Sequence, residues 1–221
     1  MPLTKLEPTP RVGDLVFNAL RDAIMSGQYR AGRRLQIRQL AEELGTSVMP
    51  VREALKRLEE LRLVETFPHR GAVVREFTRD ELLQLYAVRE ILEVEATRLG
   101  TPSGDEKKHD ELRQAFDDMG EALQRADVVS YLDLDEKLLA ILYSCSGNQV
   151  LLDTIRRLWQ RCRSYKIVGV QRQIDVGDTD ILLAYQRDLI AAVADQDVKR
   201  AERITSDSVK AAMERIRNAL P

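Results

Sequence analysis

The stretch LAEELGTSVMPVREALKRLEELRLV, residues 40–64, holds two helical patterns separated by the interruption GTSVMP. Gly45 supplies the conformational freedom that a sharp turn needs, and Ser47 is a residue type that commonly caps the start of a helix. Pro50 is compatible with the resumed helix, because first-turn N–H groups have no intrahelical partner. The interruption therefore predicts a tight turn that sets the second helix at an angle to the first.

The sequence on either side of this stretch completes a small domain. Apolar residues at helical spacing from Val12 to Ile24 predict a preceding helix, which Gly27 ends. After the stretch, LVETF and GAVVREF flank PHR, a pattern typical of a short two-stranded hairpin. Three helices with a tight turn between the second and third, followed by a hairpin, form a winged helix-turn-helix. Two ordinary core helices remain the alternative.

The third helix of this motif has two different faces. Its pattern directs Val51, Leu55 and Leu58 inward and Arg52 and Lys56 outward. In a winged helix-turn-helix, the second helix braces the phosphate backbone while the third enters the major groove of DNA. The outward face therefore predicts a contact with double-stranded DNA.

Charge is distributed unevenly along the chain. Residues 1–76 hold 13 Lys and Arg against 10 Asp and Glu, whereas residues 77–221 hold 21 against 26, within a total net charge of −2. A basic first part on an acidic body indicates that only the first part meets a polyanion. The difference is small, so it supports the motif and decides nothing alone.

The composition excludes several other classes of protein. Apolar residues make up 44% and charged residues 32%, as in soluble globular proteins. No apolar run approaches the ~18 residues of a membrane span, and MPLTKLEPTPRVGDL lacks the basic start and apolar stretch of a secretion signal. Cys145 and Cys162 fit a reducing compartment, with a disulfide as the less favoured alternative. We expect a cytoplasmic protein with no membrane partner.

From residue 78 onward, strand signals give way to helical patterns. The breaks GTPSG, RAD, SGN, VGDT and DQD separate helices predicted at about 79–99, 105–126, 128–145, 149–172, 178–195 and 197–219. We therefore predict a mainly α protein, with a winged helix-turn-helix DNA-binding domain in residues 1–76 and an all-helical effector-binding and dimerisation bundle in residues 77–221.

Longer matches point to a family. AGRRLQIRQLAEELGTSVMPVREALKRLEELRLVETFPHRGAVV resembles the GntR-type bacterial transcription regulators. The helices that follow resemble the FCD effector domain of the FadR-like branch, through YAVREILEVEATRL, DLDEKLLAILYSCSGN and YQRDLIAAVADQDVKRA in that order. The resemblance implies a transcriptional regulator, with repression as the first expectation. We expect it to bind a pseudo-palindromic operator as a homodimer and to respond to a small metabolite, such as an organic acid. The alternative is a constitutive dimeric DNA binder whose helical domain has lost sensing.

The resemblance also assigns DNA contacts to Arg38, Arg52 and a wing tip at His69 and Gly71. Their chemistry fits these roles independently. Arg38, near the start of the second helix, can meet a phosphate, and Arg52 can donate to guanine O6 and N7. Gly71 permits close backbone approach, and His69 can enter a minor groove. For neighbouring arginines such as Arg57, a solvated surface charge is an equal alternative.

The first turn of the third helix completes the predicted DNA-binding set with Ser47, Val48 and Met49. Relatives often carry an arginine at the position of Val48, where it helps to read guanine. Val48 and Met49 offer only apolar contacts, for example to a thymine methyl group. We therefore expect an operator that differs from the usual one of the family at that base pair.

The effector domain departs from the pattern that the resemblance implies. Many relatives carry an aspartate followed four residues later by a histidine, with two further histidines on the last two helices, and these hold a metal that binds a carboxylate effector. The aspartate is present as Asp135, whereas Leu139, Gln186 and Ser208 stand where the histidines would be. We expect no metal and no other cofactor, with these four residues on the wall of an effector cavity. The alternative is that they are ordinary core or surface residues.

Three arginines of the helical part allow two interpretations each. Arg89, in VREILE, could bind an acidic effector, although an Arg–Glu pair that braces the bundle is favoured. Arg156 and Arg163 lie on one predicted helix, where a solvated face is favoured over a carboxylate site.

The sequence gives little support to an enzyme. It has no Gly-rich phosphate loop, nucleophile elbow, metal-ligand cluster or Cys–His pairing. Asp133, Asp135 and Glu136 are close together, but they lack a partner base. We therefore predict a DNA-binding regulator without catalytic residues.

Overall fold

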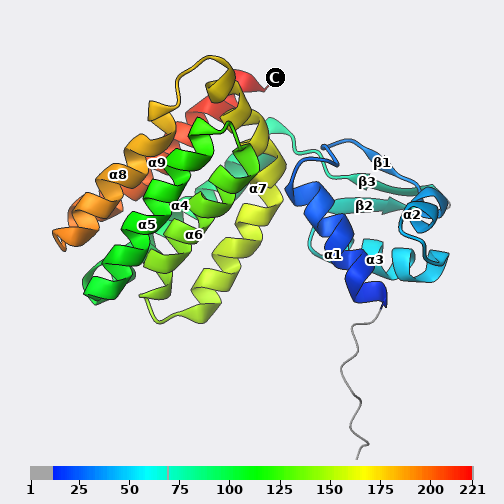
Figure 1. Cartoon of the computed structure of the whole chain (residues 1–221), viewed down its shortest axis with the longest axis horizontal. Coiled ribbons are helices and arrows are strands. Elements are labelled where there is room, and N and C mark those ends of the chain that lie inside the picture. Colours follow the sequence, from blue (N-terminus) through cyan, green and yellow to red (C-terminus); the bar gives the residue numbers. More distant parts are fainter. Residues whose placement is uncertain (1–11, 69, 221) are drawn as a thin grey trace, which may run out of the picture. The chain divides into compact units, whose positions relative to one another are not determined.

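The computed structural model describes residues 12–68 and 70–220, and the chain divides into two compact units, residues 1–76 and 77–221. The described residues contain nine α-helices and one small sheet (Figure 1). The prediction of a mainly α protein, with a winged helix-turn-helix followed by a helical bundle, is confirmed. The first unit contains α1 (Val12–Met25), β1 (Arg34–Leu35), α2 (Ile37–Glu43), α3 (Val48–Glu60), β2 (Val64–Phe67) and β3 (Gly71–Val74).

The core of the first unit forms between its helices and one face of its sheet. Helix α3 buries Val51, Leu55 and Leu58, as its periodicity predicts, and packs against both α1 and α2. Gly45 has a φ of 60°, in the left-handed region, and turns the chain between α2 and α3. This turn sets the direction of α3 and leaves its polar face exposed.

The sheet has three antiparallel strands in the order β1-β3-β2. The sequence predicts β2 and β3 as a hairpin but not β1, which is only two residues long. Leu35 of β1 pairs with Ala72 of β3, and both side chains are buried. Gly71 has a φ of 83°, and a Cβ there would lie 2.3 Å from the Leu35 carbonyl oxygen. The glycine is therefore required by the close approach of β1 to β3.

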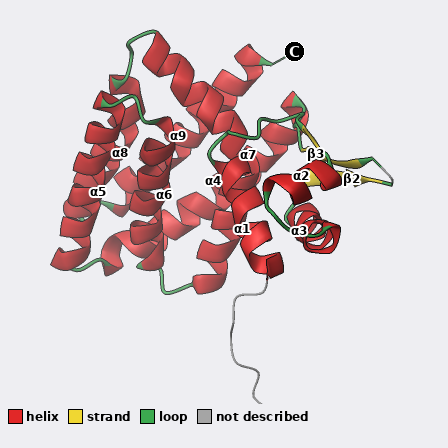
Figure 2. Cartoon of the chain, turned by 45° about the vertical axis from the view of Figure 1, so that its right-hand side comes forward, coloured by secondary structure: helices red, strands yellow, loops and turns green. Residues whose placement is uncertain are grey.

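The second unit is entirely helical in its described residues (Figure 2). Its six α-helices lie close to their predicted ranges, and a short 3₁₀ helix at Thr101–Ser103 follows the first. The α-helices are α4 (Arg79–Gly100), α5 (Glu106–Gln124), α6 (Val128–Ser144), α7 (Gln149–Asp175), α8 (Asp180–Ala194) and α9 (Val198–Ala219).

Polar side chains cap the starts of five of these helices. Thr78 and Glu81 form a reciprocal capping box at the start of α4. Further side-chain caps, each accepting from a first-turn N–H group, begin α5, α6, α7 and α9 at Asp105, Asp127, Asn148 and Asp197. These caps explain why short polar breaks in the sequence separate the helices reliably.

The bundle packs around one apolar core. Helix α4 lies against α6, α7 and α9, while α5 packs on α6 and α8, and α8 packs on α9. Leu138, Leu142, Ile155 and Trp159 are fully buried at its centre. None of the helices in the described ranges is long and apolar enough to cross a membrane. The packing of α4, α6, α7, α8 and α9 positions the cavity described below.

Candidate DNA-binding surface and ligand cavity

The outward faces of α2 and α3 carry exposed cations. Arg38 is the second residue of α2, and Arg52 and Lys56 lie one turn apart on α3. None of the three makes an ion pair with a described residue. Their charged groups are therefore free to meet phosphates or base edges.

Arg57 has a structural role instead. Its Nη1 donates to Asp14 Oδ1 at 2.7 Å, and its guanidinium lies 4.0 Å from the centre of the Phe17 ring. Both partners belong to α1. Arg57 therefore joins α3 to α1 and is more than a solvated surface charge.

The first turn of α3 presents one polar and two apolar side chains. Ser47 occupies the N-cap position in an extended conformation, but its side chain makes no capping hydrogen bond. Val48 is half-buried against the core, whereas Met49 is 62% exposed. Within this turn, Met49 and the Ser47 hydroxyl are thus the groups best placed to meet a ligand.

The wing is attached to α3 by a side-chain bridge. Glu59 Oε1 accepts from the Thr66 backbone N–H at 2.8 Å and from the Thr66 hydroxyl at 2.5 Å. These hydrogen bonds hold the pKa of Glu59 below its usual value. Gly71 begins β3 at the wing, but His69 lies outside the described residues, so its minor-groove contact stays a prediction.

The helical unit contains a cavity of about 580 Å³. Residues from α4, α6, α7, α8 and α9 line it, including several tyrosines. All five residues expected at an effector site border this one cavity, namely Arg89, Asp135, Leu139, Gln186 and Ser208. The structure thus brings the set together, and it adds cations that the sequence analysis did not identify.

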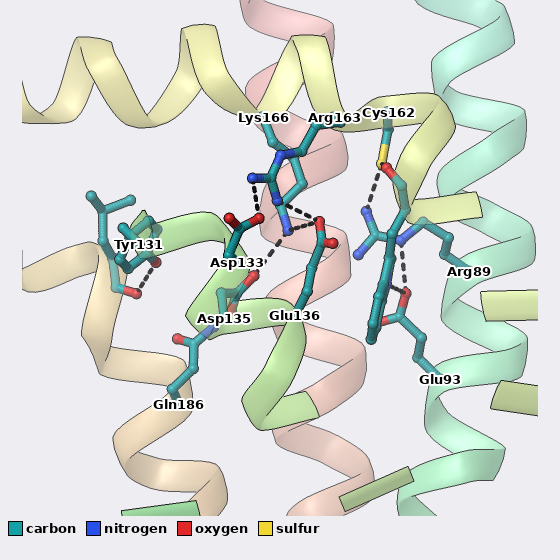
Figure 3. Close-up of polar contacts among 12 residues, drawn as sticks. Arg89, Glu93, Tyr131, Asp133, Asp135, Glu136, Cys162, Arg163, Lys166 and Gln186 are labelled. Carbon is teal, nitrogen blue, oxygen red and sulfur yellow. Dashed lines mark hydrogen bonds and ion pairs between the residues drawn. The ribbon is translucent and has the colours of Figure 1, made fainter. Parts of the chain in front are cut away.

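Asp135 lies at the centre of a polar cluster on the cavity wall. It is 6% exposed, and its two carboxylate oxygens have different partners (Figure 3). Gln186 Nε2 donates to Asp135 Oδ1 at 2.6 Å, and Lys166 Nζ donates to Asp135 Oδ2 at 2.9 Å. Lys166 also lies 3.7 Å from Glu136 Oε1. Helices α6, α7 and α8 therefore meet at one carboxylate.

The side chain of Lys166 is largely buried, at 15% exposure, and two carboxylates lie near its ammonium group. Burial lowers the pKa of Lys166, and the carboxylates of Asp135 and Glu136 more than offset this effect. The net result is a pKa above the usual value for lysine. The ammonium form of Lys166, which donates to Asp135, is therefore favoured over the neutral amine.

Arg163 is buried in a second ion-pair cluster beside the first. Its exposed fraction is 2%, so the interpretation of this arginine as part of a solvated face is wrong. Nη1 donates to Glu136 Oε1 at 3.1 Å, and Nη2 donates to Asp133 Oδ1 at 2.5 Å. Helix α7 directs this side chain toward α6, where both carboxylates lie. Arg156 is exposed, as expected.

Arg89 forms the bracing pair that the sequence favoured. Its Nε donates to Glu93 Oε1 at 2.7 Å, and both side chains are buried. The Glu93 carboxylate also accepts from Trp159 Nε1 at 2.9 Å and from the Tyr143 hydroxyl at 3.3 Å. Nη1 of Arg89 lies 3.4 Å from Cys162 Sγ. Arg89 borders the cavity, but its charge is already compensated within the bundle.

Three cavity cations were missed from the sequence. Lys166, Arg172 and Arg215 border the cavity, and neither arginine makes an ion pair with a described residue. Burial raises the pKa of Tyr165, while Arg215 and Arg172 act in the opposite direction, so both lie near that side chain. Lys166 follows Arg163 by three residues and shares its helix face, but the sequence favoured a solvated face there, so it gave no signal that Lys166 borders a cavity.

The donor set does not fit a transition metal. The family resemblance implies an aspartate with three imidazoles, but here Asp135 is accompanied by a leucine, an amide and a hydroxyl. Both oxygens of Asp135 are already engaged, one of them by an ammonium group. No three His, Cys, Asp or Glu side chains of the described residues converge as a metal site would require.

Family comparisons agree with the two-part architecture. The model of bacterial regulatory proteins of the gntR family matches residues 13–74, and the FCD domain model matches residues 84–211. These two models together cover most of the chain.

Individual relatives are transcriptional regulators. The HTH-type transcriptional regulator McbR of Escherichia coli K12 is 28% identical over 146 residues, which make up 66% of each chain. The HTH-type transcriptional repressor RspR of the same strain is 23% identical over 214 residues, 97% of this chain and 92% of RspR. The Nta operon transcriptional regulator of Aminobacter aminovorans is 32% identical over 142 residues, 63% of this chain and 66% of that protein.

Solved structures share the fold. The structure of E. coli McbR/YncC superposes with a TM-score of 0.80 at 22% identity, and that of a GntR transcriptional regulator from Rhodococcus sp. RHA1 with 0.82 at 24%. Each comparison covers 95% of this chain and 99% of the other. At these identities, the likeness establishes the fold alone.

Proposed function

The chain belongs to the GntR family of transcriptional regulators, with an FCD domain after its winged helix-turn-helix, and from this we propose how it works. It is a cytoplasmic repressor that binds a pseudo-palindromic operator as a homodimer. A small molecule, with an organic acid as the first candidate, binds the FCD domain and relieves repression. The families and relatives are regulators and not enzymes.

The DNA-binding half of the proposal is supported by the exposed cations of α2 and α3. We assign a phosphate contact to Arg38, which is exposed on α2, and a base-edge contact to Arg52, which is exposed on α3 with Lys56 one turn further along. A single small module with these few contacts gives limited specificity. Two modules related by symmetry match two half-sites, which is why a homodimer and a pseudo-palindrome belong together.

The observation that carries the sensing half is the cavity. Its volume of about 580 Å³ falls in the range of small-molecule sites. Its wall includes Lys166, Arg172 and Arg215. A helical unit that served only for dimerisation would gain nothing from charged groups around an internal cavity, because their partial desolvation is costly. This favours a sensor over the constitutive dimer.

The first test is operator binding. Fluorescence anisotropy of labelled fragments from upstream of its own operon is expected to identify a short, pseudo-palindromic site that binds more tightly than scrambled DNA. Equal affinity for every fragment at physiological salt would contradict sequence-specific recognition.

The second test is ligand coupling. A thermal-shift screen of metabolites identifies molecules that stabilise the protein, and each of these is then titrated into the protein–operator complex. We expect at least one to raise the melting temperature and to weaken operator binding. Stabilisation without any change in operator affinity would support the constitutive alternative.

A further inference from the structure

The cluster around Asp135 contains a feature that the proposed function does not require. Lys166 donates to the Asp135 carboxylate and borders the same cavity, although lysine is seldom buried unless it is paired. Its side chain is 15% exposed and that of Asp135 is 8% exposed. The chain therefore maintains a largely desolvated ion pair in the wall of the site, although the removal of two charges from water costs free energy.

The ammonium group lies where a cation would bind to Asp135. A divalent metal on this carboxylate would need one of its two oxygens and further ligands from neighbouring helices. Lys166 from α7 already occupies Oδ2, and the Gln186 amide from α8 occupies Oδ1. Figure 3 shows Lys166 and Gln186 beside Asp135. Leu139, one turn after Asp135 on α6, offers no ligand atom.

We infer that Lys166 is the resident cation of this cavity and that its ammonium group excludes a divalent metal from Asp135. A lysine ammonium has three N–H donors. One donates to Asp135, and Glu136 Oε1 lies near another at 3.7 Å, so at least one remains for the acceptor group of a ligand. The role of the remaining N–H donor in holding a ligand rests on the proposed function, whereas the exclusion of a metal by Lys166 does not.

The experiment asks whether Lys166 blocks metal binding at Asp135 once two imidazole ligands are supplied. A double variant of the full chain, Leu139→His with Gln186→His, places two imidazoles beside Asp135. A triple variant adds Lys166→Met, which keeps most of the side-chain volume and removes the charge. Ni²⁺ alone is titrated into each protein by isothermal titration calorimetry, and circular dichroism checks that each protein is folded.

We expect the triple variant to bind Ni²⁺ at least about tenfold more tightly than the double variant, because an ammonium group a few ångströms away repels the metal. Equal affinity in the double and triple variants would overturn the inference. If the triple variant does not fold, Lys166→Gln replaces Lys166→Met, and the same comparison applies.

A second measurement needs no engineered histidine. Unmodified protein purified without added metal is expected to contain no stoichiometric zinc, nickel or manganese by elemental analysis. A metal present at near one equivalent and lost in Asp135→Asn would overturn the inference. Neither measurement involves DNA or an effector, so a failure of the proposed function is distinguishable from a failure of this proposal.

Discussion

The carboxylate of Glu59, near the end of α3, accepts both hydrogen bonds that Thr66 of β2 can donate, at 2.8 Å from the backbone N–H and at 2.5 Å from the hydroxyl. The bridge joins the helix expected to enter the major groove to the strand that leads into the wing. Helix α3 and the wing together carry most of the predicted DNA contacts, namely Val48, Met49 and Arg52 on α3 and His69 and Gly71 at the wing tip. The Glu59 side chain therefore adds a polar link between α3 and β2 to their packing in the core of the first unit.

Replacing Glu59 by alanine should loosen the wing. The substitution removes two hydrogen bonds to a charged acceptor, so we expect the first unit to lose about 1–3 kcal/mol of stability and operator affinity to fall. Glu60→Ala, at an exposed position next to it, is the matched control. Calorimetry and operator titration of both variants measure the effects, and identical behaviour of the two variants would contradict a role for the bridge.

Because Glu59 accepts these hydrogen bonds as a carboxylate, the stability that it contributes should depend on pH in the acidic range. Hydrogen bonding lowers the pKa of Glu59 in the folded state, so its contribution is present above the unfolded pKa of about 4.3 and is lost as pH falls through the folded value. The stability difference between the unmodified protein and Glu59→Ala should therefore shrink below about pH 4. A stability difference that stays constant down to about pH 3, roughly one unit below the usual pKa of glutamate, would show that the charge of Glu59 is unimportant.

Arg52 and Arg38 should affect DNA binding in different ways. Arg52→Ala is expected to cost about 1–3 kcal/mol of operator affinity and to relax base preference, whereas Arg38→Ala should weaken all sequences alike and reduce the salt dependence. Arg187→Ala, an exposed position on α8, is the charge-matched control. Anisotropy against operator and scrambled DNA at several salt concentrations separates the two effects. Loss of base preference in Arg38→Ala alone would reverse the assignment.

The first turn of α3 should determine one base pair of the operator. Val48→Arg introduces a side chain that can donate two hydrogen bonds to guanine, in place of an apolar group. We expect selection from a random DNA library to recover a guanine at one position of each half-site for the variant and not for the unmodified protein. Identical selected sites would show that residue 48 does not face a base. Met49→Ala, at the more exposed neighbouring position, serves as the comparison.

The parts of this fold that local sequence determines were predicted well. Helix α3 could be placed because Val51, Leu55 and Leu58 repeat with helical spacing, and the turn before it because Gly45 adopts a positive φ. Strand β1 could not be placed, because two residues are too few to show alternation and their partners in β3, Val73 and Ala72, lie far along the chain.

The burial of charged side chains in the helical unit was also not predicted from the sequence. The burial of Arg163 and Lys166 depends on carboxylates of α6, about thirty residues earlier in the chain, and local periodicity treats both as surface residues. The cavity residues Asp135 and Gln186 came from position in a family pattern, not from any local signal. Which cation accompanies Asp135 required the packing of α7 against α6 to be known.

Alkaline pH should destabilise the helical unit. Burial raises the pKa of Tyr131 and Tyr143 well above the usual value of tyrosine, and the pKa of Lys166 is raised as well. Groups with a raised folded-state pKa retain their protons in the folded protein, so their contribution is complete below the unfolded pKa of about 10 and is lost as pH rises above it. Stability should therefore fall steeply above about pH 10. Carbon NMR of labelled tyrosine gives the check, and ionisation of Tyr131 or Tyr143 near pH 10 in the folded protein would contradict it.

The last prediction concerns the Arg89–Glu93 pair, whose Nε–Oε1 distance is 2.7 Å and which is buried on both sides. Arg89→Met leaves the Glu93 carboxylate buried with only its neutral donors, Trp159 and Tyr143. The expected cost is about 3–5 kcal/mol, because removing one partner exposes the full desolvation penalty of the other. Adding Glu93→Gln removes the unpaired charge and should restore part of the loss, since an amide oxygen can still accept from Trp159. Chemical denaturation of the two single variants and the double variant, without any ligand, gives the coupling energy. If Arg89 served to bind a ligand and not to brace the bundle, Arg89→Met would leave the ligand-free protein as stable as before and would affect only the response to an effector.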